Sequence, residues 1–299
     1  AAGANVKHLA VGNDVFAVNW GNKQQGVPGN AHDDNGTGPI GGTFAEFCVM
    51  DASKLSKKPE AIGFDTAAAV ALVGTTAFDS LNEVEVGADT NVLILGGSSA
   101  VGSIAVQLAK LRGARVSTTC SSRTMEFVNT LGADQVINYT TDSWWQLPDV
   151  MGVDVVFDCV GEANAFTHAK LVLKDQGKFI TIVDRTVGRD KSAGFDSKSN
   201  PPLSYACFHC LSNNASIQDQ LAELIASGKL QVKINRRFPF TAEGVSSMLA
   251  EQTSKKSIGK NILVIDEKAL LTSNTTFTNF EAEAPPKEEE TDVDENTFS

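Results

Sequence analysis

Residues 91–102, Asn91-Val92-Leu93-Ile94-Leu95-Gly96-Gly97-Ser98-Ser99-Ala100-Val101-Gly102, decide the fold of this chain. The apolar run at 92–95 is typical of a strand that is buried on both faces of a sheet. A glycine-rich turn follows, and a helix is expected from about 103 to 111. This order predicts a unit that binds phosphate groups, because the first amides of a helix are unpaired and its dipole is positive there.

The glycine pattern of the turn supports this interpretation. Gly97 is expected to allow the sharp turn, and Gly102 is expected to let the helix pack closely on the strand. Ser99 stands where the usual G-x-G-x-x-G pattern has its middle glycine, so the pattern alone is weak. The prediction of cofactor binding therefore depends on the strands and the helix around the turn. The alternative is a tight turn that binds no ligand.

Strands and helices continue to alternate after this unit. Further strands are expected at 115–120, 136–139, 153–158 and 178–183, with a helix at 124–131. This alternation predicts a parallel sheet that is covered by helices on both faces. The fold class is therefore α/β, with a doubly wound parallel-sheet (Rossmann) nucleotide domain.

The segments on either side of this domain have other patterns. Before it, we expect a turn and strand at 11–18, a long loop at 22–42, an alternating strand at 44–49, and one or two buried helices at 64–81 that break near Gly74. After it, we expect a helix at 217–227, strands at 232–240 and 258–265, and a helix at 241–251 between them. The acidic segment 267–299 has no periodicity, which predicts a disordered tail.

The end of the second expected strand distinguishes between the two nicotinamide cofactors. An acidic residue there would bind the ribose 2′-hydroxyl of NAD and repel the 2′-phosphate of NADP. This chain has Thr119-Cys120-Ser121-Ser122-Arg123 instead. Ser122 can donate to a phosphate, and Arg123 offers a fork of charged donors. We therefore expect NADPH, and the alternative for Arg123 is an exposed charge at the start of a helix.

A succession of motifs resembles the medium-chain dehydrogenase/reductase superfamily. The motifs are Gly42 to Phe47, Ala67 to Ala69, Gly74 to Phe78, Gly97 to Gly102, Gln107 to Lys110, Leu131 to Asp134, Phe157 to Gly161, and Ser257 to Val264. Within this superfamily the sequence resembles the quinone oxidoreductase (zeta-crystallin-like) branch, from about residue 3 to about residue 266.

This resemblance implies two domains and a reaction. Residues 1–80 would form part of a GroES-like β-rich domain, rejoined by about 235–266, and residues 81–234 would form the NADP-binding Rossmann domain. Members of this branch transfer hydride from NADPH to quinones or α,β-unsaturated carbonyls without zinc. They begin several dozen residues before the segment that Ala4-Asn5-Val6 matches, so we expect this sequence to lack their N-terminal segment.

The resemblance also implies roles for single residues. Thr76 would face the nicotinamide or its ribose, and Tyr139 would join Ser122 and Arg123 around the 2′-phosphate. The alternatives are a helix-capping Thr76 and a Tyr139 that is an ordinary aromatic at a strand end. The full set of expected cofactor-binding residues is Thr76, Gly97, Ser98, Ser99, Ala100, Val101, Gly102, Ser122, Arg123, Tyr139, Val160 and Val183, the last two along the nicotinamide-ribose side. No catalytic residue is assigned, because the cofactor carries the hydride.

Composition excludes several classes of protein. The net charge is −11, of which residues 281–299 carry −7, so no basic footprint for nucleic acid exists. No apolar run of about 18 residues occurs, which argues against a membrane span. Five scattered cysteines do not suggest a disulfide framework and favour a reducing compartment. We expect the cytoplasm, with import into an organelle left open.

The cysteines and histidines do not form a complete set of zinc ligands. Cys207-Phe208-His209-Cys210 has no second cysteine pair to complete a zinc site, and His32 and His168 are expected to be exposed, so no metal is expected. The expected partner is a small quinone or enone, and a homodimer is left open. The alternatives are an enoyl-thioester reductase, an alcohol dehydrogenase, and an NADPH-binding sensor or scaffold with little turnover.

Overall fold

The computed structural model describes residues 2–18, 43–187, 203–209, 214–254 and 256–266. The expected loop at 22–42 with His32, residue Cys210 of the C-x-x-C motif, and the expected acidic tail at 267–299 lie outside the described residues.

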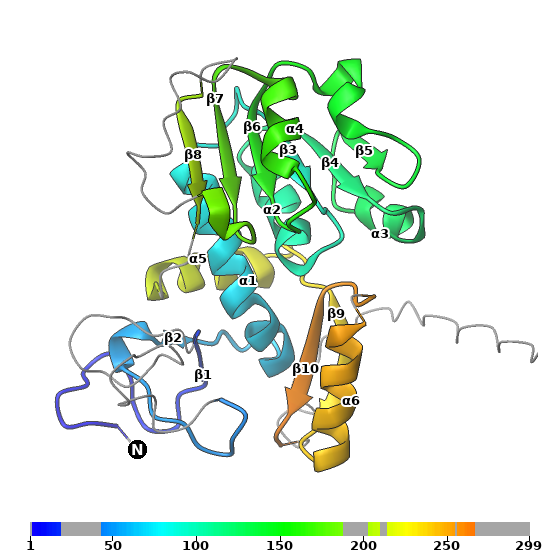
Figure 1. Cartoon of the computed structure of the whole chain (residues 1–299). Coiled ribbons are helices and arrows are strands. Elements are labelled where there is room, and N and C mark those ends of the chain that lie inside the picture. The colour runs from blue at the N-terminus through cyan, green and yellow to red at the C-terminus, as the bar shows by residue number, and fades with distance from the viewer. Residues whose placement is uncertain (1, 19–42, 188–202, 210–213, 255, 267–299) are drawn as a thin grey trace, which may run out of the picture.

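A parallel sheet forms the centre of the larger part of the molecule (Figure 1). Its strands are β3 (Asn91–Leu95), β4 (Arg115–Cys120), β5 (Gln135–Asn138), β6 (Val153–Asp158), β7 (Leu173–Thr181) and β8 (Tyr205–Phe208). All neighbours pair in parallel, in the order β5-β4-β3-β6-β7-β8. This is the 3-2-1-4-5-6 order of a Rossmann domain, so the predicted doubly wound fold is confirmed.

Helices cover both faces of the sheet, because alternate residues of each strand point to opposite faces. On β3, Val92 and Ile94 join one apolar core, and Leu93 and Leu95 join the other. The first core is covered by α1 (Phe64–Glu83), α2 (Ala100–Leu111), α3 (Met125–Asn129) and α5 (Ala215–Ala226). The second is covered by α4 (Ala165–Val172) and the short helices η3 (Trp144–Gln146) and η4 (Pro148–Val150).

Helix α1 runs without a break through Gly74, so the predicted break there is wrong. A Cβ at Gly74 would lie 2.8 Å from Cδ1 of Leu221 on α5. The glycine therefore allows α5 to approach α1 closely, and tertiary packing outweighs its low helix propensity. No described helix is both long and apolar enough to cross a membrane.

A further prediction, the strand at 44–49, is wrong. Residues 44–49 form no strand, and Phe47 is 88% exposed, because an alternating pattern forms a strand only where a neighbouring strand pairs with it. His168, expected at the surface, is partly exposed there, and its ring stacks on Trp145 with the ring centroids 3.8 Å apart. The other described N-terminal elements are β1 (Val15–Phe16), η1 (Ala52–Lys54) and β2 (Ser56–Lys57).

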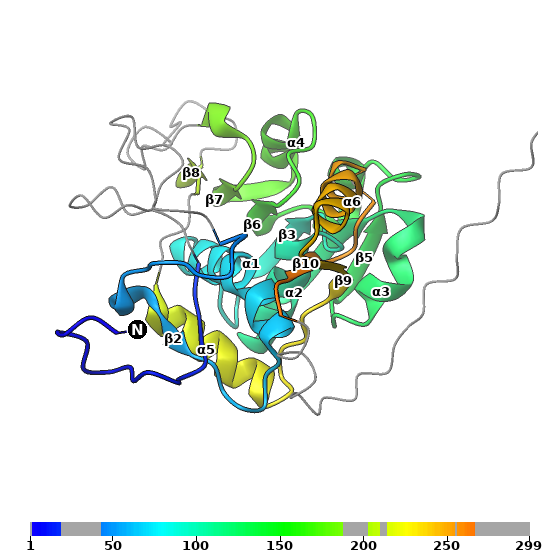
Figure 2. The ribbon, with the colours of Figure 1, turned by 90° about the horizontal axis from the view of Figure 1, so that it is seen from below.

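A small unit follows α5 and lies near the carboxyl ends of the sheet strands (Figures 1 and 2). It consists of β9 (Ile234–Pro239), α6 (Ala242–Thr253) and β10 (Lys260–Val264), and its two strands pair in parallel. This β9–α6–β10 unit contacts the start of α1, where Arg237 bonds to Asp65. Among the described strands, β1 and β2 pair only with each other, so the proposed joining of residues 235–266 to residues 1–80 stays a prediction.

Candidate cofactor-binding site

The turn after β3 is shaped by two adjacent glycines. Gly96 has a φ of 85°, in the left-handed region that favours glycine, and its amide donates to Oγ1 of Thr119 at 2.9 Å. The amide of Gly97 donates to the Thr119 carbonyl oxygen at 2.8 Å. A Cβ at Gly97 would lie 2.4 Å from Oγ1 of Thr118 on β4. Gly96 therefore makes the sharp turn that the sequence assigned to Gly97, and Gly97 allows the close approach of β4.

The first turn of α2 leaves amides free beside these glycines. Ser99 caps the helix, with its Oγ accepting a hydrogen bond from the Gly102 amide at 3.0 Å. Within the described part of the chain, the amides of Ala100 and Val101 have no hydrogen-bond partner. A Cβ at Gly102 would lie 2.1 Å from the carbonyl oxygen of Gly96, so only glycine fits there. Free amides in the first turn of a helix can donate hydrogen bonds to a pyrophosphate, and the tight turn lets the pyrophosphate come close to them.

The residues expected around a 2′-phosphate meet at the ends of β4 and β5. Ser122 and Arg123 are exposed in η2 (Ser122–Thr124), and the side chain of Tyr139 is half-exposed. The amide of Tyr139 donates to the Cys120 carbonyl oxygen at 3.0 Å, which holds the two strand ends together. Nη2 of Arg123 donates to the Lys256 carbonyl oxygen at 3.0 Å. Its other donor groups leave Arg123 able to bind an anion.

Val160 and Val183 lie on the other side of the turn, at the ends of β6 and β7. A Cβ at Gly96 would lie 2.2 Å from Cγ1 of Val160, and a Cβ at Gly161 would lie 2.5 Å from Cγ1 of Val183. Each valine thus packs against the glycine that follows the neighbouring strand in the sheet, Val160 against Gly96 after β3 and Val183 against Gly161 after β6. Both side chains are about half exposed, at 45% and 46%. We call these two residues the valine ledge.

The sequence reasoning missed two polar residues behind the valine ledge. Asp158 is fully buried, and its Oδ1 accepts hydrogen bonds from the amides of Val160 at 3.0 Å and Gly161 at 2.8 Å. Its Oδ2 accepts from Oγ1 of Thr181 at 2.9 Å. The signal was present in the sequence, because an acid that ends an apolar strand must be paired if that end is buried.

Thr76 lies in the middle of α1 rather than at a cap. Its side chain is buried, and its Oγ1 donates to the Leu72 carbonyl oxygen at 2.8 Å. The proposed contact of Thr76 with the nicotinamide stays a prediction. Cys159 follows Asp158, and burial raises the pKa of its thiol well above the ordinary value. This thiol is therefore protonated at neutral pH and unsuited to act as a nucleophile.

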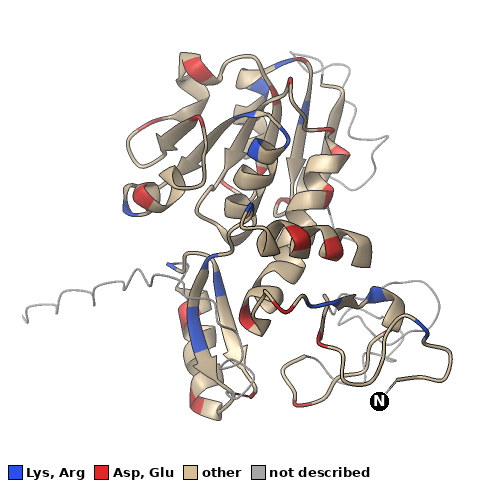
Figure 3. Ribbon diagram, turned by 180° about the vertical axis from the view of Figure 1, so that it is seen from behind, with Lys and Arg blue, Asp and Glu red and all other residues tan. Residues whose placement is uncertain are grey.

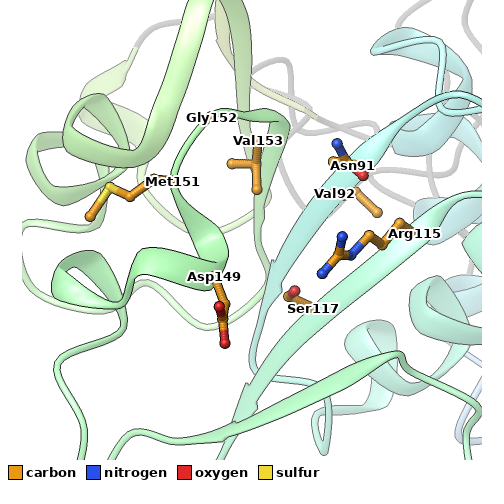
Figure 4. A pocket seen from close by; sticks show the side chains of 8 residues that line it. All are labelled: Asn91, Val92, Arg115, Ser117, Asp149, Met151, Gly152 and Val153. Atoms are coloured by element: carbon orange, nitrogen blue, oxygen red, sulfur yellow. The ribbon is translucent and has the colours of Figure 1, made fainter.

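A hollow of about 80 Å³ lies at the opposite edge of the sheet, at the amino-terminal ends of β3, β4 and β6 (Figure 4). Asn91, Arg115, Ser117, Asp149 and Gly152 are among its lining residues. Doubly wound sheets bind ligands at the carboxyl ends of their strands, so this hollow is separate from the cofactor site. Among the described residues, no group of three or more His, Cys, Asp or Glu side chains could hold a metal ion.

The strand order and the free helix amides together define a doubly wound domain of the Rossmann class. Residues 131–263 match the family described as zinc-binding dehydrogenase. The quinone oxidoreductase of Coxiella burnetii superposes with a TM-score of 0.72 at 27% identity, over 88% of this chain and 75% of that one. The chain is therefore similar to the medium-chain dehydrogenase/reductase superfamily and, within it, to the quinone oxidoreductase branch.

Two curated relatives are also similar to this chain over most of its length. A 2-methylene-furan-3-one reductase of Solanum lycopersicum is 27% identical over 264 residues. A chloroplastic NADPH-dependent alkenal/one oxidoreductase of Arabidopsis thaliana is 30% identical over 264 residues. Each match covers 87% of this chain, and the chain spans 60% of the length of each relative.

Proposed function

We propose that this protein is an NADPH-dependent oxidoreductase that transfers hydride to a quinone or an α,β-unsaturated carbonyl, without zinc. The observation that carries the proposal is the pair of free amides at Ala100 and Val101 in the first turn of α2, with Ser122 and Arg123 exposed after the neighbouring strand β4. The relatives support the acceptor class, since one is named for alkenals and enones and a structural neighbour for quinones.

Each part of the site has a binding task in this proposal. The amides of Ala100 and Val101, with Ser98, would hold the pyrophosphate. Ser122, Arg123 and Tyr139 would hold the 2′-phosphate, and no acid lies at the end of β4 to repel it. The valine ledge, with Thr76, would lie along the nicotinamide and its ribose.

The cofactor, when bound, supplies the hydride, and the chain supplies position and shelter from water. The apolar side chains of the valine ledge would keep water away from the face of the nicotinamide that they cover. No side chain is assigned as proton donor, because the reduced product can take its proton from solvent. The choice of NADPH over NADH rests on Ser122 and Arg123.

Turnover measurements test this function directly. The purified protein is mixed with NADPH or NADH and with p-benzoquinone, methyl vinyl ketone, a crotonyl thioester or no acceptor, and consumption of the reduced nicotinamide is followed. We expect consumption of NADPH with the quinone or the enone, and little with NADH. Faster turnover of the thioester would favour an enoyl-thioester reductase, and oxidation of an alcohol with NADP⁺ would favour an alcohol dehydrogenase. Tight binding of NADPH without turnover of any acceptor would favour a sensor or scaffold.

We also propose a reducing compartment, either the cytoplasm or an organelle. The described cysteines Cys48, Cys120, Cys159 and Cys207 are free thiols, and relatives are named as mitochondrial and chloroplast proteins. Cell fractionation with an antibody against this chain tests the compartment. Light scattering after gel filtration tests whether the protein forms a homodimer.

A further inference from the structure

The most unusual polar residue near the proposed site is Asp158. Its side chain is fully buried at the end of β6, and no lysine, arginine or histidine among the described residues pairs with it. Burying a carboxylate is costly unless hydrogen bonds replace its water shell. Here two backbone amides and one hydroxyl do so, and all three donors belong to the ends of β6 and β7.

Thr181 extends this network into the loop after β7. Its Oγ1 donates to Asp158 and accepts hydrogen bonds from the amides of Val183 at 3.2 Å and Asp184 at 3.1 Å. The hydroxyl therefore uses its one donor and both acceptor positions. Asp158 and Thr181 are also direct partners in the β6–β7 register. One continuous network thus joins the backbone of Val160 to the backbone of Val183.

The network has a geometric consequence for the valine ledge. Val160 packs against Gly96 of the phosphate-binding turn, and Val183 packs against Gly161. The amides that orient both valines are held by acceptors, on Asp158 and Thr181, that are fully buried. The network therefore fixes the position of the two valine side chains relative to the turn that would hold the pyrophosphate.

We propose that Asp158 and Thr181 are positioning residues, which hold the valine ledge where it supports the nicotinamide half of the cofactor. This inference rests on the proposed function. Neither residue touches the cofactor; each acts through the backbone of Val160 and Val183. Binding sites need their contacting groups placed to within about half an ångström, and supporting hydrogen bonds provide that accuracy.

The test compares two ligands that differ in the nicotinamide half. NADPH reaches the valine ledge, whereas adenosine 2′,5′-bisphosphate has only the adenosine end with its phosphates. Calorimetry on the full chain measures both affinities for the wild type and for Thr181→Val, Thr181→Ser and Val183→Ala. For Thr181→Val we expect NADPH to bind about tenfold more weakly, because a buried carboxylate oxygen and two amides lose their partner. The bisphosphate should bind within about twofold of the wild type, and Thr181→Ser should restore NADPH affinity.

Two further variants keep the outcome decisive. Val183→Ala trims the exposed ledge without touching the hydrogen bonds, so it should fold and weaken NADPH only. Ser117→Ala is the control, since it removes a buried hydroxyl bond of 3.0 Å to Gln135 at the far edge of the sheet and should leave both affinities unchanged. The inference is overturned if Thr181→Val weakens both ligands equally, or if Val183→Ala leaves NADPH binding intact. A wild type that binds neither ligand would instead refute the proposed function.

Discussion

Three glycines in and after the turn between β3 and α2 are each required by a different neighbour. An added Cβ would meet a methyl group of Val160 at Gly96, the hydroxyl of Thr118 at Gly97, and the backbone oxygen of Gly96 at Gly102. A side chain can turn away from such a contact, but a backbone carbonyl inside a tight turn cannot. Gly102 is therefore the glycine whose replacement should distort the turn most.

Replacing Gly102 by alanine should damage both stability and cofactor binding. The new methyl group would lie 2.1 Å from the Gly96 oxygen, so α2 must move away from the turn that its first amides share. Such overpacking typically costs about 1–3 kcal/mol of stability. Urea unfolding and NADPH titration measure the two effects. Gly87→Ala is the matched control, because a Cβ there meets nothing within 4 Å, and an equal loss in that variant would contradict the argument.

Arg123→Gln should reduce the preference for NADPH over NADH. The substitution removes the charge that would face the 2′-phosphate, and hydrogen bonds to charged groups contribute about 1.5–3 kcal/mol. NADPH should therefore bind roughly ten- to a hundredfold more weakly, while NADH affinity stays unchanged. Fluorescence titration with both nucleotides measures this. Arg115→Gln removes a positive charge from the other end of β4 and should change neither affinity. A similar loss for NADH would show that Arg123 acts on the fold and not on the phosphate.

At the scale of elements, one ion pair connects α2 to the turn that precedes β5. Nζ of Lys110 lies 2.8 Å from Oδ2 of Asp134, and the same oxygen accepts from the Val116 amide at 2.7 Å. Asp134 thus joins α2, β4 and the entry to β5. The hydrogen bond from Lys110, together with that from Val116, lowers the pKa of the Asp134 carboxyl.

The lowered pKa of Asp134 predicts a pH-dependent stability. A carboxyl whose pKa is lower in the folded state stabilises the fold above its unfolded pKa, about 3.9, and loses this contribution as pH falls through the folded value. Asp134→Asn should therefore destabilise the protein by about 1 kcal/mol at pH 7, because both partners are partly exposed. The difference from the wild type should shrink from about pH 4 downward. Urea unfolding across this range measures it, and a constant difference would argue against the ion pair.

The elements that sequence could predict are those with strong local patterns. The apolar runs of β3 and β6 and the periodic residues of α5 depend on local sequence, and the structure has all of them. The uninterrupted α1 at Gly74 could not be predicted, because its reason is Leu221, far away in the chain. Likewise, the pairing of Asp158 with Thr181 depends on the register between β6 and β7, which no local pattern contains.

At the scale of the whole molecule, hydrogen bonds join the β9–α6–β10 unit, and the segment that leads into it, to α1, α2 and η2. Gln107 on α2 makes two hydrogen bonds of 2.9 Å with the backbone of Gln231. Arg123 donates to the Lys256 carbonyl oxygen, and Nε of Arg237 donates to Asp65 at 3.0 Å. Figure 3 shows the blue segment of β9 beside the lower end of α1. Because Arg123 is also proposed to bind the 2′-phosphate, this residue connects the unit to the proposed cofactor site.

Asp65→Asn should loosen the β9–α6–β10 unit without loosening the central sheet. Asp65 stands in the first turn of α1, is 12% exposed, and pairs with the half-exposed Arg237, so losing its charge should cost about 1 kcal/mol. Hydrogen exchange within β9 and β10 should then become about fivefold faster, while exchange in β3 is unchanged. Asp14→Asn is the control, because Asp14 pairs with Lys58 beside β1 and β2. Faster exchange in β3 as well would mean that the unit and the sheet open as one body, and Asp65 would then stabilise the whole fold rather than one junction.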